Sequence, residues 1–583
     1  MLILRQKLAC VAIGLFFLLC MALGAWRLDA DPSPLKRLGD VNDEGWWLHN
    51  ARCKVLFGTF LPDEMNQGLI GAPLFTAAEW LCFSVAGVSL FTGRLVSLAA
   101  LWLILLMLFF LVRDAFSAGK AMLAVAMLGL MHETLMYARW STPILPEMCF
   151  LTAILFFWER GKKGSPGWMM AAGGCLAAAG AMKLSSFYFA PSIVLFLAGS
   201  WVVRREMDRR RLVLFVAGAA LATAVLAAFF LANWQQFRFF AATVGRANFV
   251  GSHREWEGLR GFLSVLRNPA LKHPGVSILT VFVSLWLLEQ VVAVSQRGLR
   301  SALCRLSTAE FYSLCWLAGS MTALAVSTDK ADRRFVLFFV PMTILAAMFT
   351  LRQFQCAADR SGRCDGVVPR SWLARIAFWL TTTLVWGYYT GGAIILVGTR
   401  ALYADALRLR LPAYAVSLAA SALVAAVLFL LRKPKVALAG WLGLFFAVSL
   451  TLDGLWYLRP SYTLRDASRS LASAAADGTM FVGYWSHELS LENRALPIQS
   501  PWRQEAPLNG WFADEASWRS FLMIVNDDFD GEPGRGCDAE KLASFSPRRV
   551  RQVCQVNLCP KLLGGYRFRA TVYHVAADGV PHG

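Results

Sequence analysis

Uncharged runs long enough to cross a lipid bilayer recur along almost the whole 583-residue chain. A spanning helix needs roughly 20 predominantly apolar residues, and these runs lack the alternation that is typical of membrane barrel strands. Charged residues make up 16% of the chain, against about a quarter in an average soluble domain. The sequence therefore predicts an α-helical protein that crosses the membrane many times.

The apolar runs predict about thirteen transmembrane helices. They lie near residues 8–26, 91–112, 119–136, 144–158, 167–183, 185–203, 212–232, 275–296, 311–326, 333–351, 372–399, 411–431 and 436–457. Alternate connections between them carry the clusters of Lys and Arg, for example Arg160/Lys162/Lys163 and Arg209/Arg210/Arg211. Cytoplasmic loops are enriched in Lys and Arg, so these connections and the N-terminus are expected inside. The net charge of +19 is then explained by the basic clusters that orient the protein in the membrane, and no nucleic-acid partner is predicted.

The apolar stretch 68–90 is predicted to lie along the outer membrane surface instead of crossing it. If it crossed, every later basic connection would fall outside, and Trp80 suits the headgroup region. The predicted organisation is a transmembrane module over 1–457, with an outer loop at 27–90, followed by an extracytoplasmic domain over 458–583. Strand-like and helix-like segments alternate in that domain, which predicts an α/β fold. The expected location is the cell inner or plasma membrane.

Eight charged residues gather at the predicted outer ends of the spans. The acids are Asp43, Glu44 and Glu147, and the cations are Arg139, Lys183, Lys330, Arg333 and Arg334. Any one of them could be a snorkelling side chain at a helix end. Together they suit a substrate whose phosphate is anchored in lipid and whose reacting group faces the aqueous side.

Four segments of the first 350 residues, taken in order, resemble the GT-C superfamily of membrane glycosyltransferases. The closest branch is the aminoarabinose transferase and protein O-mannosyltransferase-like family. The segments are NDEGWWLHNARCKVLFGTF, GAPLFTAAEWLCFSVAGVSLFTGRLVSLAA, AGAMKLSSFYFAPSIVL and STDKADRRFVLFFVPMTIL. The resemblance implies transfer of a sugar from a polyprenyl-phosphate donor to a hydroxyl of a protein, lipid or polysaccharide on the outer side, with inversion.

The resemblance also implies roles for the outer residues. Asp43 matches the family's first acid and would take the acceptor proton, with Glu44 beside it in the catalytic pair. Lys183, Arg333 and Arg334, together with Lys330, would stabilise the departing phosphate, while Arg139 and Glu147 would bind and orient the substrates. One departure concerns metal: Gly71 and Ala72 stand where the aminoarabinose branch has Glu-Lys before the Pro. A divalent metal is therefore not supported by the sequence, and no metal ligand is predicted.

Other interpretations compete at three levels. Asn42 or Asp43 could cap a helix that begins here, with both acids facing its N-terminal dipole. Asp29 and Asp31 lie in the Pro-rich stretch DADPSPLK, for which a solvated turn is predicted. For the whole chain, a transporter or flippase of lipid-linked sugars would place ionisable groups near mid-bilayer and show repeated halves, whereas here the mid-span regions are nearly free of charge and no repeat is detected. A polysaccharide polymerase or ligase would be expected to use a large outer loop.

Overall fold

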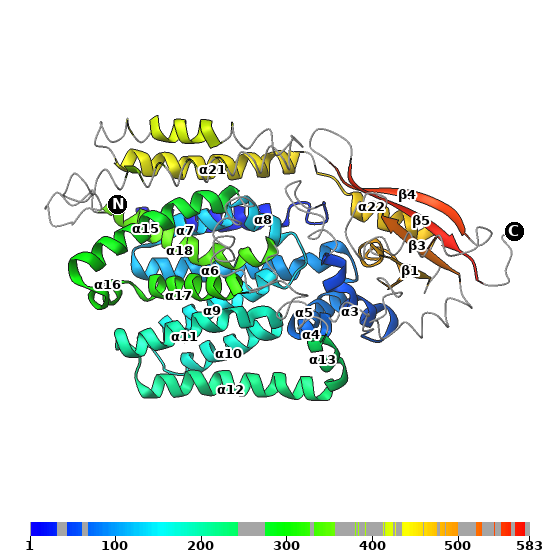
Figure 1. The fold of residues 1–583 in the computed structure, drawn as a ribbon, viewed down its shortest axis with the longest axis horizontal. Coiled ribbons are helices and arrows are strands. Elements are labelled where there is room, and N and C mark those ends of the chain that lie inside the picture. The colour runs from blue at the N-terminus through cyan, green and yellow to red at the C-terminus, as the bar shows by residue number, and fades with distance from the viewer. Residues whose placement is uncertain are drawn as a thin grey trace.

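The computed structural model describes residues 2–31, 43–60, 68–242, 274–326, 332–355, 434–458, 460–474, 479–483, 485–498, 520–526, 550–560 and 566–577, with residue 542 and some positions between 379 and 426. A bundle of helices occupies one end of an elongated molecule, and a β-sheet lies at the other end (Figure 1).

Most of the predicted spans are helices of this bundle. They are α1 (Leu2–Ala25), α6 (Leu90–Ala115), α9 (Ile144–Lys163), α10 (Trp168–Met182), α12 (Arg209–Ala232), α15 (Pro274–Arg297), α17 (Thr308–Val326), α18 (Phe339–Gln355) and α21 (Pro434–Leu458), with the short α13 (Trp234–Phe240) and α16 (Leu299–Arg305). Among the described residues, five helices are long and apolar enough to cross a membrane, or up to six if the bent pair α7–α8 is one span. The predicted spans 372–399 and 411–431 lie largely outside the described residues, so the total of thirteen stays a prediction.

The outer surface of the bundle is apolar, as a lipid-facing surface requires. On α12, Val213, Leu221 and Leu231 are 57%, 64% and 70% exposed. Contiguous exposed patches of this kind are rare on soluble monomers. The helix begins where the side chain of Asp208 accepts a hydrogen bond from the Arg211 amide at 2.7 Å, which satisfies one of the free N–H groups at its N-terminus.

The predicted span 119–136 is wrong as a single helix. It consists of α7 (Ala118–Gly129) and α8 (His132–Ala138), bent by 67°. The break lets two buried polar side chains reach partners on other helices. His132 Nδ1 lies 2.6 Å from Asp453 Oδ1 on α21, and Glu133 Oε1 accepts a hydrogen bond from the Gly275 amide at 2.7 Å.

Two further predicted spans begin with a tighter helix. Residues 185–203 form the 3₁₀ helix η1 (Leu184–Phe189), α11 (Ala190–Ala198) and the π-helical turn η2 (Gly199–Val203). Pro191 lies in the first turn of α11, where its missing N–H costs nothing because no helical partner exists there. The predicted span 333–351 likewise opens as the 3₁₀ helix η4 (Asp332–Phe338) before α18.

The first outer loop folds into α3 (Asp43–Phe57), α4 (Gly68–Gly71) and α5 (Pro73–Ala86). With 14 residues, α5 is about 21 Å long, which is too short for the roughly 30 Å hydrocarbon core. Its Glu79 and Phe83 are buried, whereas Trp80 and Val85 are 41% and 81% exposed. This distribution suits a helix that lies at the membrane surface, as predicted for 68–90.

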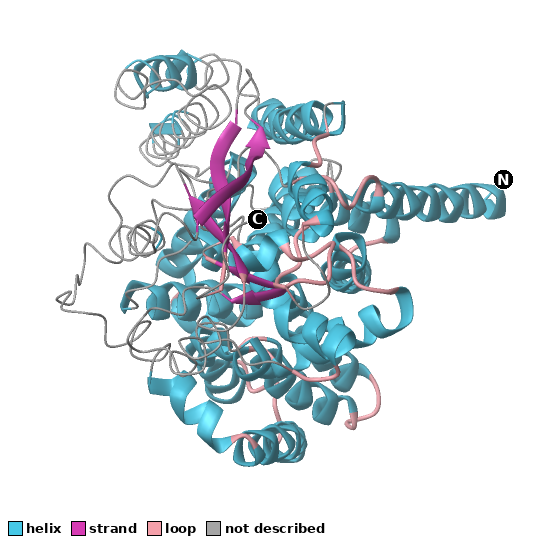
Figure 2. Cartoon of the chain, turned by 90° about the vertical axis from the view of Figure 1, so that its right-hand side faces the viewer, coloured by secondary structure: helices cyan, strands magenta, loops and turns pink. Residues whose placement is uncertain are grey.

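The C-terminal region contains the predicted mixture of strands and helices. Its sheet has the order β2-β1-β3-β5-β4, with β1 parallel to both neighbours and β5 antiparallel to β3 and β4. The strands are β1 (Met480–Val482), β2 (Leu496–Ile498), β3 (Phe521–Asn526), β4 (Val550–Pro560) and β5 (Tyr566–Val575), accompanied by α22 (Thr463–Ser470), η5 (Leu471–Ser473) and α23 (Ser486–Leu489). Figure 2 shows the strands in front of the helices when the molecule is viewed from its sheet end.

The first outer loop and the C-terminal region share one apolar core. Leu48 of α3 and Phe83 of α5 belong to the same buried cluster as Leu464, Trp485 and Leu522. Burial of apolar side chains is the main favourable term in such contacts. The loop is therefore packed against the sheet region and not only against the bundle.

The predicted solvated turn is wrong for Asp31, whereas Asp29 lies in a turn and is half-buried. Asp31 is 2% exposed, and its carboxylate accepts hydrogen bonds from the amides of Thr463 at 2.7 Å and Leu464 at 3.0 Å. It thus caps α22 from 432 positions away, and charged acceptors at a helix start are favourable. Asp29 forms an ion pair with Arg465 at 2.6 Å.

Candidate active site

The two acids of the first loop begin the helix that carries them. Asp43 and Glu44 occupy the first turn of α3, where carboxylates are stabilised by the helix dipole. Their exposed fractions are only 6% and 0%. A helix therefore begins at these acids, which fixes both carboxylates in space and is compatible with a chemical role. Asn42 lies outside the described residues, so the cap expected from Asn42 or Asp43 stays a prediction.

Glu44 is held by an arginine that the bundle provides. Arg94, in the first turn of α6, donates from Nε to Glu44 Oε1 and from Nη2 to Oε2, both at 2.7 Å. Its Nη1 donates to the carbonyls of Leu28 and Ala30, and the Ser141 amide donates to Glu44 Oε1 at 2.9 Å. Both side chains of the pair are fully buried. Such a bidentate pair fixes α3 firmly against the bundle.

Glu79 of α5 extends this network. Ser141 Oγ donates to Glu79 Oε1 at 2.9 Å. Burial, reinforced by the negative charge of Glu44, raises the pKa of Glu79 well above its usual range. The uncharged form of Glu79 is therefore favoured beside the charged Glu44.

Lys183 and Glu147 lie beside the same helix. Lys183, at the C-terminal end of α10, places its Nζ 5.8 Å from the centre of the Trp47 ring on α3, within cation–π range. Three residues further, Ser186 donates from its amide to the Lys183 carbonyl at 2.9 Å and from Oγ to Glu147 Oε1 at 2.7 Å. Ser186 thus links Glu147, at the start of α9, to the end of α10, where Lys183 lies against α3 through Trp47.

Arg139 has a different setting. Its guanidinium lies over the rings of Trp456 and Tyr457 on α21, 4.1 and 5.3 Å from their centres, and donates to the Arg27 carbonyl. These contacts join α8 to α21. The substrate-binding role predicted for Arg139 stays a prediction.

The three predicted phosphate-binding cations near residues 330–334 fall partly outside the described residues. Lys330 is outside them, and of Arg333 and Arg334 only the backbone is described, within η4. That 3₁₀ helix packs against α9, the helix that carries Glu147.

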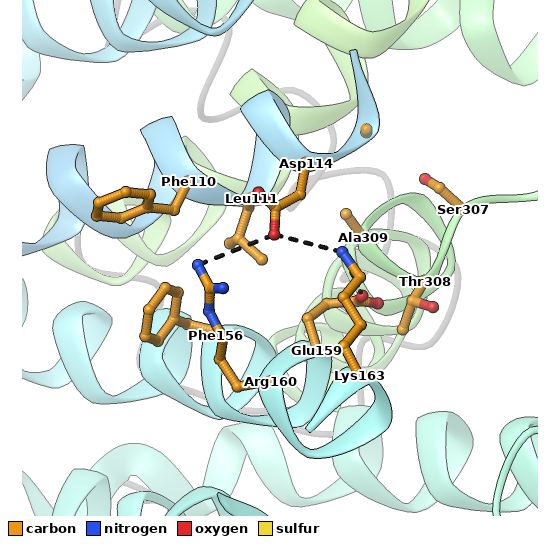
Figure 3. A pocket seen from close by; sticks show the side chains of 11 residues that line it. Phe110, Leu111, Asp114, Phe156, Glu159, Arg160, Lys163, Ser307, Thr308 and Ala309 are labelled. Atoms are coloured by element: carbon orange, nitrogen blue, oxygen red, sulfur yellow. Dashed lines mark hydrogen bonds and ion pairs between the residues drawn. The ribbon is translucent and has the colours of Figure 1, made fainter. Parts of the chain in front are cut away.

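A pocket of about 180 Å³ lies at the opposite ends of α6 and α9 (Figure 3). Its acid Asp114 is paired with Arg113 at 2.9 Å, Lys163 at 3.3 Å and Arg160 at 3.8 Å. Partly exposed pairs of this kind contribute little to stability. The pocket belongs to the basic end of the bundle and is separate from the α3 site.

No group of three or more His, Cys, Asp or Glu side chains is placed to hold a metal ion in the part of the chain that the structure describes.

Several residues of the site carry no recognisable signal in the sequence. Glu44 and Arg94 are 50 positions apart, and Glu44 and Ser141 are 97 apart. The only hint is that Arg94 opens an otherwise apolar span, where a charge is costly unless it is paired. Glu488, whose side chain reaches the start of α3, lies in a segment that looks like an ordinary amphipathic run.

Comparisons with known proteins bear on the fold. Residues 71–230 match the family model "Dolichyl-phosphate-mannose-protein mannosyltransferase". No curated protein matches the chain by sequence at a significant level.

Solved structures give matches over longer stretches. ArnT from Cupriavidus metallidurans bound to undecaprenyl phosphate is similar over 98% of this chain and 99% of its own, with 14% identity and a TM-score of 0.57. Its apo form gives 16% identity, 98% and 100% coverage, and a TM-score of 0.58. Arabinosyltransferase EmbB from Mycobacterium smegmatis matches 80% of this chain and 43% of its own, with 16% identity and a TM-score of 0.50.

The chain has the fold of ArnT, and its residues 71–230 match the mannosyltransferase family model.

Proposed function

We propose that this protein is a membrane glycosyltransferase that moves a sugar from a polyprenyl-phosphate donor to an acceptor hydroxyl. The observation that carries the proposal is the similarity to ArnT over 98% of the chain, in a structure that holds undecaprenyl phosphate. Fold similarity alone does not assign chemistry. Support also comes from the α3 site, which combines carboxylates with a buried lysine next to the membrane-facing helices.

The two ends of the bundle support a site on the extracytoplasmic side. Arg94, which binds Glu44, lies near the start of α6, and Arg113 and Asp114 of the basic cluster lie at its end. Because basic clusters mark the cytoplasmic side, the start of α3 and the sheet region lie on the other side. The acceptor would then be approached from outside the cell membrane.

The proposed reaction is a single displacement with inversion. Asp43 takes the acceptor proton as the hydroxyl attacks the anomeric carbon, the bond from that carbon to the phosphate oxygen breaks, and polyprenyl phosphate leaves. Lys183 stabilises the leaving phosphate, and Lys330, Arg333 and Arg334 are proposed to assist it. Arg139 and Glu147 are proposed to orient sugar or acceptor. Glu44, which is fully buried on Arg94, orients Asp43 through α3.

A donor panel tests the proposed function. The purified chain is reconstituted in liposomes and incubated with polyprenyl phosphates that carry different hexoses and pentoses, with candidate protein, lipid and polysaccharide acceptors. We expect mass spectrometry to show loss of one donor and the appearance of free polyprenyl phosphate. Movement of the intact donor between leaflets, with no sugar released from any donor, would instead identify a flippase.

Replacing Lys183 with Gln is expected to raise the donor KM about tenfold or more, because a hydrogen bond to a charged group contributes about 1.5–3 kcal/mol. Steady-state kinetics with the donor found in the panel measure this. Lys54→Gln is the control. Lys54 lies on α3, the helix that Lys183 contacts, but at an exposed position, where it donates to the Gly58 carbonyl. Equal donor KM and kcat in the two variants would exclude Lys183 as a phosphate-binding residue.

A further inference from the structure

A short helix of the C-terminal region touches the first turn of α3. Glu488, on α23, accepts a hydrogen bond at Oε1 from the Gly45 amide at 3.1 Å. The backbones approach so closely that a Cβ on Gly45 would lie 2.6 Å from both the Glu488 nitrogen and the His487 carbonyl carbon. Only glycine allows this approach. Gly45 follows directly after Asp43 and Glu44, so the contact is made at the turn that carries the acids.

The same segment holds α3 further along its length. The His49 and His487 rings meet edge to face with centres 4.6 Å apart. Arg52 donates to the carbonyls of Asn493 at 2.7 Å and Ala495 at 2.8 Å. Residues 487–495 therefore contact both the start and the middle of the helix, while Glu44 links its acidic turn to the bundle.

Glu488 is a buried acid next to other acids. It is 1% exposed, and burial, reinforced by the charges of Asp43 and Glu44, raises its pKa well above the usual range. Its uncharged form is thus favoured. The charged or titratable groups on the elements packed against it are Asp43, Glu44, His49, Arg52, Cys53 and Lys54 on α3, Arg465, Asp466 and Arg469 on α22, and His487 on α23, while β1 and β2 carry none.

We propose that Glu488 is a positioning residue for glycosyl transfer: it fixes the first turn of α3, and with it the Asp43 carboxylate, in the orientation that the acceptor hydroxyl requires. The inference rests on the proposed function. A neutral carboxyl can accept the Gly45 amide hydrogen without adding a second negative charge beside Asp43. Small displacements of a base are costly in enzymes, about 100-fold for 1 Å.

The test compares two acids of the same region. Glu492 also accepts a backbone amide of the membrane part, that of Leu90 at 2.8 Å, and its carboxylate pairs with Arg469 of α22 at 3.0 Å. Glu488→Ala is expected to lower kcat about 10- to 100-fold with an unchanged donor KM, whereas Glu492→Ala stays within about threefold of wild type. Equal losses in both variants, or none in Glu488→Ala, would overturn the inference.

Glu488→Gln provides the conservative rescue. Its amide oxygen can accept from Gly45, so kcat at neutral pH should stay within about threefold of wild type. The folded-state pKa of Glu488 is raised, so docking of α3 is fully stable at low pH and weakens as pH rises toward that pKa. The Gln variant lacks this titration, and its activity should fall less steeply as pH rises. A pH dependence of kcat identical to that of wild type would contradict the proposal.

Hydrogen–deuterium exchange separates this inference from the proposed function. Glu488→Ala, but not Glu492→Ala, should speed amide exchange at the start of α3, whatever the substrate. Gly45→Ala, which leaves the Glu488 carboxyl intact but forces the backbones apart, should do the same. If no donor is consumed by wild type yet exchange changes as expected, the assigned reaction fails and the contact stands. Unchanged exchange in all variants overturns the positioning role.

Discussion

Asp43→Asn is expected to lower kcat for sugar transfer by about 10²–10⁴-fold, the range that general-base assistance contributes. Asn has the same shape as Asp and is an equally good residue at a helix start, so α3 should persist. It cannot accept the acceptor proton. The measurement is single-turnover transfer by the reconstituted variant, together with binding of polyprenyl phosphate, which should be unaffected because the phosphate is held by cations.

Asp466→Asn is the matched control. Asp466 lies in the first turn of α22 and pairs with Arg465, so the same substitution is made at an equivalent helix position away from the site. Its activity should equal that of wild type. Near-normal product formation by Asp43→Asn would exclude Asp43 as the base. Asp43 and Glu44 would then have only a structural role at the start of α3.

The pair Glu44–Arg94 is expected to dominate the stability of the first loop. Removing one partner, by Glu44→Gln or Arg94→Met, leaves a buried charge without its partner and should cost about 3–5 kcal/mol of unfolding free energy. The double variant should lose clearly less than the sum, because it buries no unpaired charge. Chemical unfolding in detergent micelles, carried out on all four proteins, gives the coupling free energy.

The same variants decide what Glu44 does. If Glu44→Gln is as stable as wild type but inactive, Glu44 acts on the substrates directly, as the sequence comparison implies. If it is unstable and its residual activity follows the folded fraction, its role is to hold α3. The bonds to Arg94 and Ser141 favour the second outcome.

The sequence predicts well whatever depends on local pattern. Apolar runs locate α6, α12 and α21 within a few residues, since a span must be apolar over about 20 residues. Alternating β-branched and aromatic residues locate β3 and β5 at their observed ends. The three-residue β2 is missed because LPI is too short for periodicity to register.

Contacts between distant segments could not be predicted. The bend between α7 and α8 depends on His132 meeting Asp453, 321 positions away, and nothing near residue 130 encodes that partner. Asp31 looks like a turn residue because Asp and Pro favour turns, yet the fold uses it as a cap for α22. At the site, the sequence identified the acids of α3 and Lys183 but could not supply Arg94, Ser141 or Glu488, which reach them only through tertiary packing.

The contact between Gly45 and Glu488 joins residues 443 positions apart, and this separation has a consequence for biosynthesis. While the ribosome is still making the bundle, the acidic turn of α3 has already been synthesised, but residues 487–495, which contact it, have not. A nascent chain can thus form the helices of the bundle while its acidic turn still lacks the contact with Glu488.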